Sequence, residues 1–244
     1  MIQKLKERRA AISVENVGVA YQRRAGFFRK ENFWALKDVS FDVCHGETLG
    51  VIGRNGVGKS TLLRLLAGLI SPDRGHVVNH GVTATLLSLQ VGFVQYLTGR
   101  ENAILSGMML GLSKQAVLAQ MDHIRSYANI GEFFDQPMHG YSSGMRARLG
   151  FSVAIHADPD VVLLDEVLGV GDALFREKSL NTIKDLVHSD NSVVLVSHQP
   201  AMHREMCDRL VWIEAGVVQG AGDVGTVLDD YLQYHKKKEA SDAA

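Results

Sequence analysis

The feature that most constrains this chain is a glycine-rich turn at residues 53–61. Its sequence, Gly-Arg-Asn-Gly-Val-Gly-Lys-Ser-Thr, matches the pattern G-x-x-x-x-G-K-[ST] in full. Periodicity predicts a buried strand over residues 47–52 before the turn and a helix over residues 61–68 after it. Strand, glycine-rich turn and helix, in this order, form the context in which the pattern makes a phosphate-binding loop. The chain is therefore expected to fold around such a loop as an α/β protein.

The predicted phosphate loop combines several sources of attraction for an anion. Its glycines let the backbone curl so that N–H groups point inward, and the N-terminus of the following helix adds its positive dipole end. Lys59 is expected to reach the β- and γ-phosphates of a nucleotide, and the hydroxyl of Ser60 is expected to ligate Mg²⁺. The candidate nucleotide-binding residues of the loop are Gly53, Asn55, Gly56, Gly58, Lys59, Ser60 and Thr61.

Two carboxylates follow an apolar run at residues 161–164. The run is predicted to be a buried parallel strand, and ligands of open parallel sheets bind at the carboxyl ends of the strands. Asp165 is therefore expected to face the Mg²⁺ that Ser60 holds. Glu166, one residue further on, is expected to polarise the attacking water as the catalytic base.

A second apolar run, at residues 193–196, is followed by Ser197 and His198. Its strand is predicted to lie beside the strand that ends at Asp165. From this position His198 is expected to hydrogen-bond the γ-phosphate, with Ser197 helping to orient the imidazole ring.

A turn that contains serine and glycine, at residues 141–145, opens a predicted helix. Serine and glycine are favoured N-caps, so the turn has a purely structural explanation. Ser142 and Gly144 also have the chemistry of a second anion site at a helix N-terminus. The residue pattern alone leaves both interpretations open.

In this order, the motifs resemble those of ATP-binding-cassette (ABC) ATPases over nearly the whole chain. Residues 141–145 correspond to the family signature L-S-G-G-Q, with Ser142 as its serine and Gly144 as its second glycine. The resemblance implies that Ser142 contacts the γ-phosphate across a dimer, and it implies a nucleotide-site role for Asp172. The departures from the signature are Tyr141, Ser143 and Met145.

Two further residues are assigned by the resemblance alone. Tyr21 takes the place of the aromatic residue that stacks on adenine, with Trp34 or a phenylalanine of the following segment as the alternative. Gln90 takes the place of the glutamine that contacts Mg²⁺ where the helical part joins the core, with Gln95 as the alternative.

The predicted elements and the resemblance agree on one fold class, an α/β P-loop NTPase with a mostly parallel, RecA-like sheet. An antiparallel β lobe is expected at the N-terminus, and a helical subdomain is expected as an insertion at about residues 90–154. The core is expected over about residues 10–89 and 155–236. Residues 1–236 would then form a single ABC ATPase domain, followed by a polar tail at 237–244.

Alternating apolar residues predict strands at residues 11–20 and 35–43, with the segment 23–33 as a loop between them. The loop contains Phe27, Phe28 and several basic residues. It is expected either to contact a membrane subunit or lipid headgroups, or to fold back onto the domain. Helices are predicted at residues 101–112, at 114–130 and from 224 to about 235.

Four segments resemble one branch of the family, the ATPases of polysaccharide exporters that serve O-antigen, capsule and teichoic acid. The segments are residues 33–41, 97–102, 141–145 and 165–172. This resemblance implies an ATP-hydrolysing subunit that drives export of a lipid-linked polysaccharide across the cytoplasmic membrane. Some O-antigen members add a C-terminal carbohydrate-binding domain. None is expected here, because the chain ends soon after His235.

The resemblance also implies an assembly. Two copies of the chain are expected to form a head-to-tail homodimer that sandwiches two ATP molecules and binds two copies of a membrane-spanning permease. The chain is expected at the cytoplasmic face of the inner membrane, held there by the permease. The alternatives are the ATPase of a small-solute importer and a soluble ABC protein outside transport.

Composition limits the remaining possibilities. The 26 basic and 27 acidic residues nearly balance, which argues against a nucleic-acid partner. No apolar run approaches the roughly 18 residues that cross a bilayer, so a membrane role is expected to come through a partner. The two cysteines, Cys44 and Cys207, are far apart in the sequence and favour a reduced, cytosolic chain.

Overall fold

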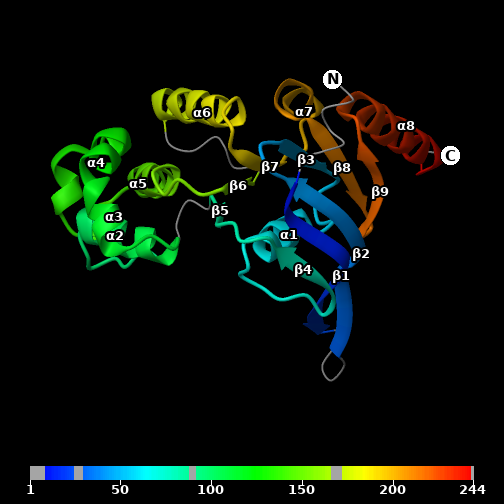
Figure 1. Ribbon diagram of the computed structural model, residues 1–244, viewed down its shortest axis with the longest axis horizontal. Helices are drawn as coiled ribbons and strands as arrows, with labels where there is room; N and C mark the ends of the chain where they lie inside the picture. Colours follow the sequence, from blue (N-terminus) through cyan, green and yellow to red (C-terminus); the bar gives the residue numbers. More distant parts are fainter. Residues whose placement is uncertain (1–8, 25–29, 88–91, 166–171, 243–244) are drawn as a thin grey trace.

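A computed structural model of the chain describes residues 9–24, 30–87, 92–165 and 172–242. The described residues form a mixed sheet with the strand order β4-β1-β2-β9-β8-β3-β7-β6-β5 (Figure 1). The strands are β1 (Ala10–Arg24), β2 (Lys30–Cys44), β3 (Thr48–Ile52), β4 (Arg74–Asn79), β5 (Ala84–Leu86), β6 (Val161–Leu164), β7 (Ser192–Val196), β8 (Arg209–Glu214) and β9 (Val217–Gly222). The helices are α1 (Lys59–Leu66), α2 (Gly99–Met109), α3 (Lys114–Ala119), α4 (Met121–Ala128), α5 (Ser143–Ile155), α6 (Ala173–Val187), α7 (Pro200–Met206) and α8 (Val224–Asp242), with 3₁₀ helices η2 (Gly131–Asp135) and η3 (Met138–Gly140).

The centre of the sheet is parallel and buried on both faces. β3 pairs in parallel with β7 and β8, β7 with β6, and β6 with β5. Every residue of β3, β6 and β7 is buried. Side chains alternate between the faces of a strand, so Val161 and Leu163 pack in one core while Val162 and Leu164 pack in another. The continuous apolar runs of the sequence are therefore strands covered on both sides, as predicted.

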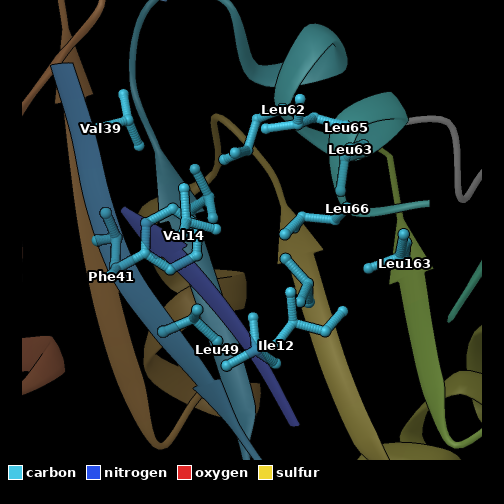
Figure 2. Packing of buried hydrophobic residues seen from close by; sticks show 14 of the residues in the cluster. Ile12, Val14, Val39, Phe41, Leu49, Leu62, Leu63, Leu65, Leu66 and Leu163 are labelled. Carbon is cyan, nitrogen blue, oxygen red and sulfur yellow. The ribbon is translucent and has the colours of Figure 1, made fainter. Parts of the chain in front are cut away.

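The two cores lie on opposite faces of this parallel sheet. On one face, Leu62, Leu63 and Leu66 of α1 belong to the same cluster as Ile12 of β1 and Phe41 of β2 (Figure 2). On the other face, α6 and α7 cover the strands (Figure 1). The parallel strands are thus held between α1 with the N-terminal hairpin and the pair α6 and α7.

The N-terminal strands form the expected antiparallel lobe, since β1 pairs with both β2 and β4 in antiparallel register. The prediction of a loop over residues 23–33 is wrong for most of that segment. β1 continues to Arg24 and β2 begins at Lys30, with Tyr21 opposite Phe33 and Arg24 opposite Lys30. Aromatic residues at facing positions favour strand pairing, which extends the hairpin beyond the alternating apolar runs. The predicted contact residues Phe27 and Phe28 lie outside the described residues.

The helices from α2 to α5 form a separate lobe with its own core, at the left of Figure 1. This lobe leaves the sheet after β5 and returns at β6, and β5 and β6 are parallel neighbours. The helical part is therefore inserted between two adjacent strands. Helix α2 begins at a capping box in which Thr98 and Glu101 bond each other's backbone N–H groups.

Two predicted helices differ from the observed ones. The single helix predicted at residues 114–130 is divided into α3 and α4 at Gln120, where the backbone has φ −92° and ψ 0°. The last helix, predicted to end near residue 235, continues to Asp242. Lysine, glutamate and alanine after residue 235 have high helix propensity, and Lys238 lies 3.7 Å from the carboxylate of Glu214. Most of the segment expected as a polar tail is therefore helical.

Candidate functional site

The loop after β3 has the geometry that its glycines predict. Gly56 and Gly58 adopt left-handed conformations, with φ of 83° and 102°. A Cβ on Gly58 would lie 2.5 Å from the carbonyl oxygen of Ala35, and one on Gly53 would lie 2.3 Å from that of Ile213. These distances are too short for any side chain, so both positions require glycine. The loop ends at Lys59, the first residue of α1.

The Lys59 ammonium group is held inside the loop. Its Nζ donates hydrogen bonds to the carbonyl oxygens of Gly53 at 2.6 Å and Arg54 at 3.0 Å, and the residue is only 7% exposed. Burial lowers the pKa of Lys59 below its ordinary value, while the nearby Asp165 carboxylate acts in the opposite direction. The loop therefore holds a cation at the turn whose backbone N–H groups are expected to bind an anion.

The hydroxyl of Ser60 donates a hydrogen bond to Oδ2 of Asp165 at 3.0 Å. Ser60 is on α1 and Asp165 directly follows β6, so the fold brings together residues that are far apart in the sequence. A hydroxyl and a carboxylate at this distance are the oxygen donors that Mg²⁺ takes in proteins. The donor set predicted from the sequence is therefore compatible with the ion.

His198 lies near the same edge of the sheet, two residues beyond the end of β7. β7 lies between β3 and β6, with Val196 opposite Val51 and Leu195 opposite Leu164. His198 is exposed, whereas Ser197 is buried. The Ser197 hydroxyl accepts a hydrogen bond from the backbone N–H of Gln199 at 3.1 Å. The carboxyl ends of three neighbouring strands thus carry the loop, His198 and Asp165.

A cavity of about 360 Å³ opens beside the loop. Tyr21 is 41% exposed and lines it, and its hydroxyl lies 3.2 Å from Oγ1 of Thr61. Trp34, the alternative adenine contact, lines an adjoining cavity of about 640 Å³ that shares Phe33, Ala35, Asn55 and Gly56 with the first. The Arg74 guanidinium lies 4.3 Å from the centre of the Trp34 ring. The 360 Å³ cavity is lined by Tyr21, Phe33, Ala35, Asn55, Gly56, Gly58, Lys59, Ser60, Thr61 and Asp165.

Ser142 caps helix α5, and its Oγ accepts a hydrogen bond from the backbone N–H of Met145 at 3.1 Å. Ser142 and Gly144 line a third cavity, of about 390 Å³. The residues that line this cavity are all different from those that line the cavity beside Lys59. Within one copy, the fold does not bring Ser142 to the phosphate loop.

Asp172 lies with Ser142 and not with the phosphate loop. Its carboxylate caps helix α6 by accepting from the backbone N–H of Phe175 at 3.0 Å, and it forms an ion pair with Arg148 of α5. The Arg148 guanidinium carbon also lies 5.5 Å from the centre of the Phe175 ring. Arg148 could not be recognised from the sequence, because a charge pair between two helices leaves no mark in the periodicity of either helix.

Two predicted site residues, Glu166 and Gln90, lie outside the described residues. Gln95, the alternative to Gln90, is exposed. Its backbone carbonyl oxygen accepts a hydrogen bond from the backbone N–H of His139 in the helical lobe. It does not line the described cavity beside Lys59.

A glycine loop between a buried strand and a helix, with a lysine, a serine and an aspartate at the carboxyl ends of parallel strands, defines a P-loop nucleotide-binding protein. A family model with the description "ABC transporter" matches residues 36–169, which is more than half of the chain. The chain belongs to the ABC transporter family, and the resemblance to ABC ATPases drawn from its motifs is confirmed.

Curated relatives match most of the chain. It is 41% identical to the teichoic acids export ATP-binding protein TagH of Listeria innocua over 85% of its length, and spans 62% of that relative. It is also 41% identical to the O-antigen export system ATP-binding protein RfbB of Klebsiella pneumoniae over 87% of its length, and spans 86% of that relative.

Solved structures confirm the predicted fold class. A dimeric, post-hydrolysis structure of the ATP-binding cassette MJ0796 with ADP and phosphate matches 87% of this chain and 98% of its own, with a TM-score of 0.69 and 22% identity. An ATP-binding subunit of an ABC transporter matches 91% of this chain and 93% of its own, with a TM-score of 0.73 and 22% identity. No helix in the described ranges is long and apolar enough to cross a membrane.

Proposed function

We propose that this chain is the ATP-hydrolysing subunit of an ABC exporter that moves a lipid-linked polysaccharide across the cytoplasmic membrane. The observation that carries the proposal is the 41% identity to a named O-antigen export ATP-binding protein over 87% of the chain. The second named relative serves teichoic acid export, so the shared cargo class is a cell-surface polysaccharide. The hydrogen bond between Ser60 and Asp165, in the same cavity as Lys59, supports the ATPase chemistry.

Each site residue predicted from the sequence has a definite role in this proposal. Lys59 binds the β- and γ-phosphates, and Tyr21 stacks on adenine from the wall of the 360 Å³ cavity. Ser60 and Asp165 hold Mg²⁺, with Gln90 as a further ligand. The ion, when bound, neutralises charge on the phosphate oxygens. Glu166 takes the proton of the attacking water, and His198 donates a hydrogen bond to the γ-phosphate.

The separation of the two anion sites supports a composite site. Ser142 and Lys59 line different cavities of one copy, so a site that uses both requires two copies. A head-to-tail homodimer meets this requirement twice, with one ATP at each of the two composite sites in its interface. Asp172 lies beside Ser142 and would reach the nucleotide of the neighbouring copy.

We further propose that the dimer binds two copies of a membrane-spanning permease at the cytoplasmic face of the membrane. Hydrolysis removes the γ-phosphate that bridges the two copies, so the dimer opens. Opening and closing of the dimer would then drive the permease between its conformations.

Replacement of the chain by its Lys59→Ala variant in the organism that carries the gene tests the export function. Surface polysaccharide should be lost while its lipid-linked form accumulates inside the cell, and a wild-type copy should restore the surface material. An unchanged amount of surface polysaccharide would contradict the export function, even if the purified chain hydrolyses ATP.

A further inference from the structure

A buried histidine, His203, lies behind the predicted γ-phosphate contact. It is on helix α7, which begins two residues after His198, and its side chain is 0% exposed. Its Nε2 lies 2.9 Å from the carbonyl oxygen of Ser197. That carbonyl belongs to the peptide group that joins Ser197 to His198. The imidazole of His203 is therefore bonded directly to the backbone that carries His198.

Two partners fix the tautomer of His203. A carbonyl oxygen only accepts hydrogen bonds, so Nε2 carries the proton and donates it to Ser197. Nδ1 then accepts from the thiol of Cys207, whose Sγ lies 3.6 Å away. Burial lowers the pKa of His203 and raises the pKa of Cys207 to about 12, so the ring stays neutral and the thiol keeps its proton.

A glycine in the strand before the phosphate loop makes room for this ring. A Cβ on Gly50 of β3 would lie 2.7 Å from Nδ1 of His203 and 2.9 Å from Sγ of Cys207. Real Cβ atoms do not approach other atoms so closely, so a side chain at residue 50 would displace the imidazole. His203 therefore contacts both the strand that leads into the phosphate loop and the backbone that leads into His198.

We propose that His203 is a positioning residue for ATP hydrolysis, because its Nε2–H bond to Ser197 fixes the peptide group that aims His198 at the γ-phosphate. The inference rests on the proposed ATPase function and on the role of His198 in it. The bond is made to the backbone before His198 and not to residues 53–61, which bind the nucleotide. Loss of the bond should therefore slow hydrolysis and leave nucleotide affinity unchanged.

Two substitutions in the full chain separate the hydrogen bond from the volume of the ring. His203→Met introduces a side chain of similar length that has no hydrogen-bond donor. His203→Gln introduces an amide whose N–H can donate from nearly the same place as Nε2. A buried hydrogen bond contributes about 0.5–1.5 kcal/mol, or roughly 2- to 13-fold in rate. His203→Met should lower kcat by about this factor with KM and the ATP dissociation constant unchanged, and His203→Gln should restore most of kcat.

A double-substitution cycle tests whether His203 acts through His198. In the His198→Ala background, His203→Met should cause no further loss of kcat, because the residue that it positions is absent. A full additional loss in that background would assign His203 a general structural role and overturn the proposal. Wild-type kcat in His203→Met would overturn it as well.

The control is His156→Met, which removes a half-buried histidine that is also bonded to a backbone carbonyl, that of Ser152 in the helical lobe. His156 lies outside the proposed site, and its variant should keep wild-type kcat. If His203→Met does not fold, His203→Gln is compared with His203→Asn, whose shorter amide does not reach the position of Nε2. Equal kcat in these two variants would overturn the proposal. Absence of ATPase activity in the wild-type chain would instead refute the proposed function.

Discussion

At the scale of single residues, the site depends on one buried cation. Lys59 is 7% exposed, and desolvation of an ammonium group is unfavourable unless partners replace the lost water. The carbonyl oxygens of Gly53 and Arg54 are such partners, and both are in the loop that Lys59 serves. These two hydrogen bonds therefore fix the position of the lysine side chain, and they also stabilise the curled backbone of the loop.

Lys59→Ala is expected to weaken ATP binding to the purified chain about 10- to 100-fold, because each charge-assisted hydrogen bond contributes roughly 1.5–3 kcal/mol. A titration with a fluorescent ATP analogue measures the dissociation constant. Arg64→Ala, which removes an exposed charge from the same helix, is the control and should bind as wild type does. Equal affinities of the two variants would show that Lys59 does not contact the phosphates.

Glu166→Gln is expected to bind ATP with wild-type affinity and to hydrolyse it about 10²- to 10⁴-fold more slowly, because the amide cannot act as a general base. Single-turnover hydrolysis of radiolabelled ATP measures the rate. The same change at an exposed glutamate of α6, Glu177→Gln, should leave the rate unchanged. A rate close to wild type in Glu166→Gln would assign the base to another residue.

Acid should destabilise the chain through two histidines, the buried His203 and the half-buried His156. Burial lowers the pKa of His203 and of His156 below the ordinary value of 6.5 in the folded chain. As the pH falls through 6.5, the unfolded chain binds protons that the folded chain does not, so the free energy of unfolding decreases until the pH reaches the folded-state pKa values. His203→Gln removes one of these groups and should make the decrease less steep in urea unfolding at a series of pH values. An identical pH dependence would contradict this account.

At the scale of elements, β3 is fixed at both of its ends. Its C-terminal end leads into the phosphate loop. At its N-terminal end, the buried carboxylate of Glu47 binds Arg209 of β8 through Nη2 at 2.8 Å and Nε at 3.3 Å, and it also accepts from the backbone N–H of Cys44. Because Glu47 is 1% exposed, these partners take the place of the water that its carboxylate would otherwise bind.

Arg209→Met is expected to lower the free energy of unfolding by about 3–5 kcal/mol, because it leaves a carboxylate buried without its cation. Urea unfolding followed by circular dichroism measures the change. Arg204→Met removes an arginine from an exposed pair with Asp229 and should cost less than about 1 kcal/mol. If the two variants are equally stable, Glu47 does not depend on Arg209.

The elements that could be predicted from the sequence are those whose own residues specify them. Continuous apolar runs predicted the buried strands β3, β6 and β7, and the glycine pattern predicted the phosphate loop. The length of the β1–β2 hairpin and the extent of α8 were missed, because they depend on contacts between segments such as Lys238 with Glu214. The pairing of Asp172 with Arg148 was missed for the same reason, although Asp172 itself could be identified from its motif.

At the scale of the whole molecule, the fold keeps the phosphate loop apart from the anion site proposed at Ser142. The phosphate loop belongs to the sheet, whereas Ser142 belongs to a helical lobe inserted between β5 and β6. One copy therefore carries the two proposed half-sites in different places. This arrangement gives the proposed dimer its head-to-tail symmetry, because each half-site needs the other half from a second copy.

Mixed dimers test this central claim most directly. Both copies carry Glu166→Gln to prevent hydrolysis, and each copy carries a different tag so that mixed dimers can be purified. The measured quantity is the number of ATP molecules retained per dimer. If each site combines Lys59 of one copy with Ser142 of the other, a dimer with Lys59→Ala in one copy and Ser142→Ala in the other keeps one intact site and retains one ATP. A dimer with both substitutions in the same copy should retain none. The reverse result, with ATP retained only when both substitutions share a copy, would contradict the account.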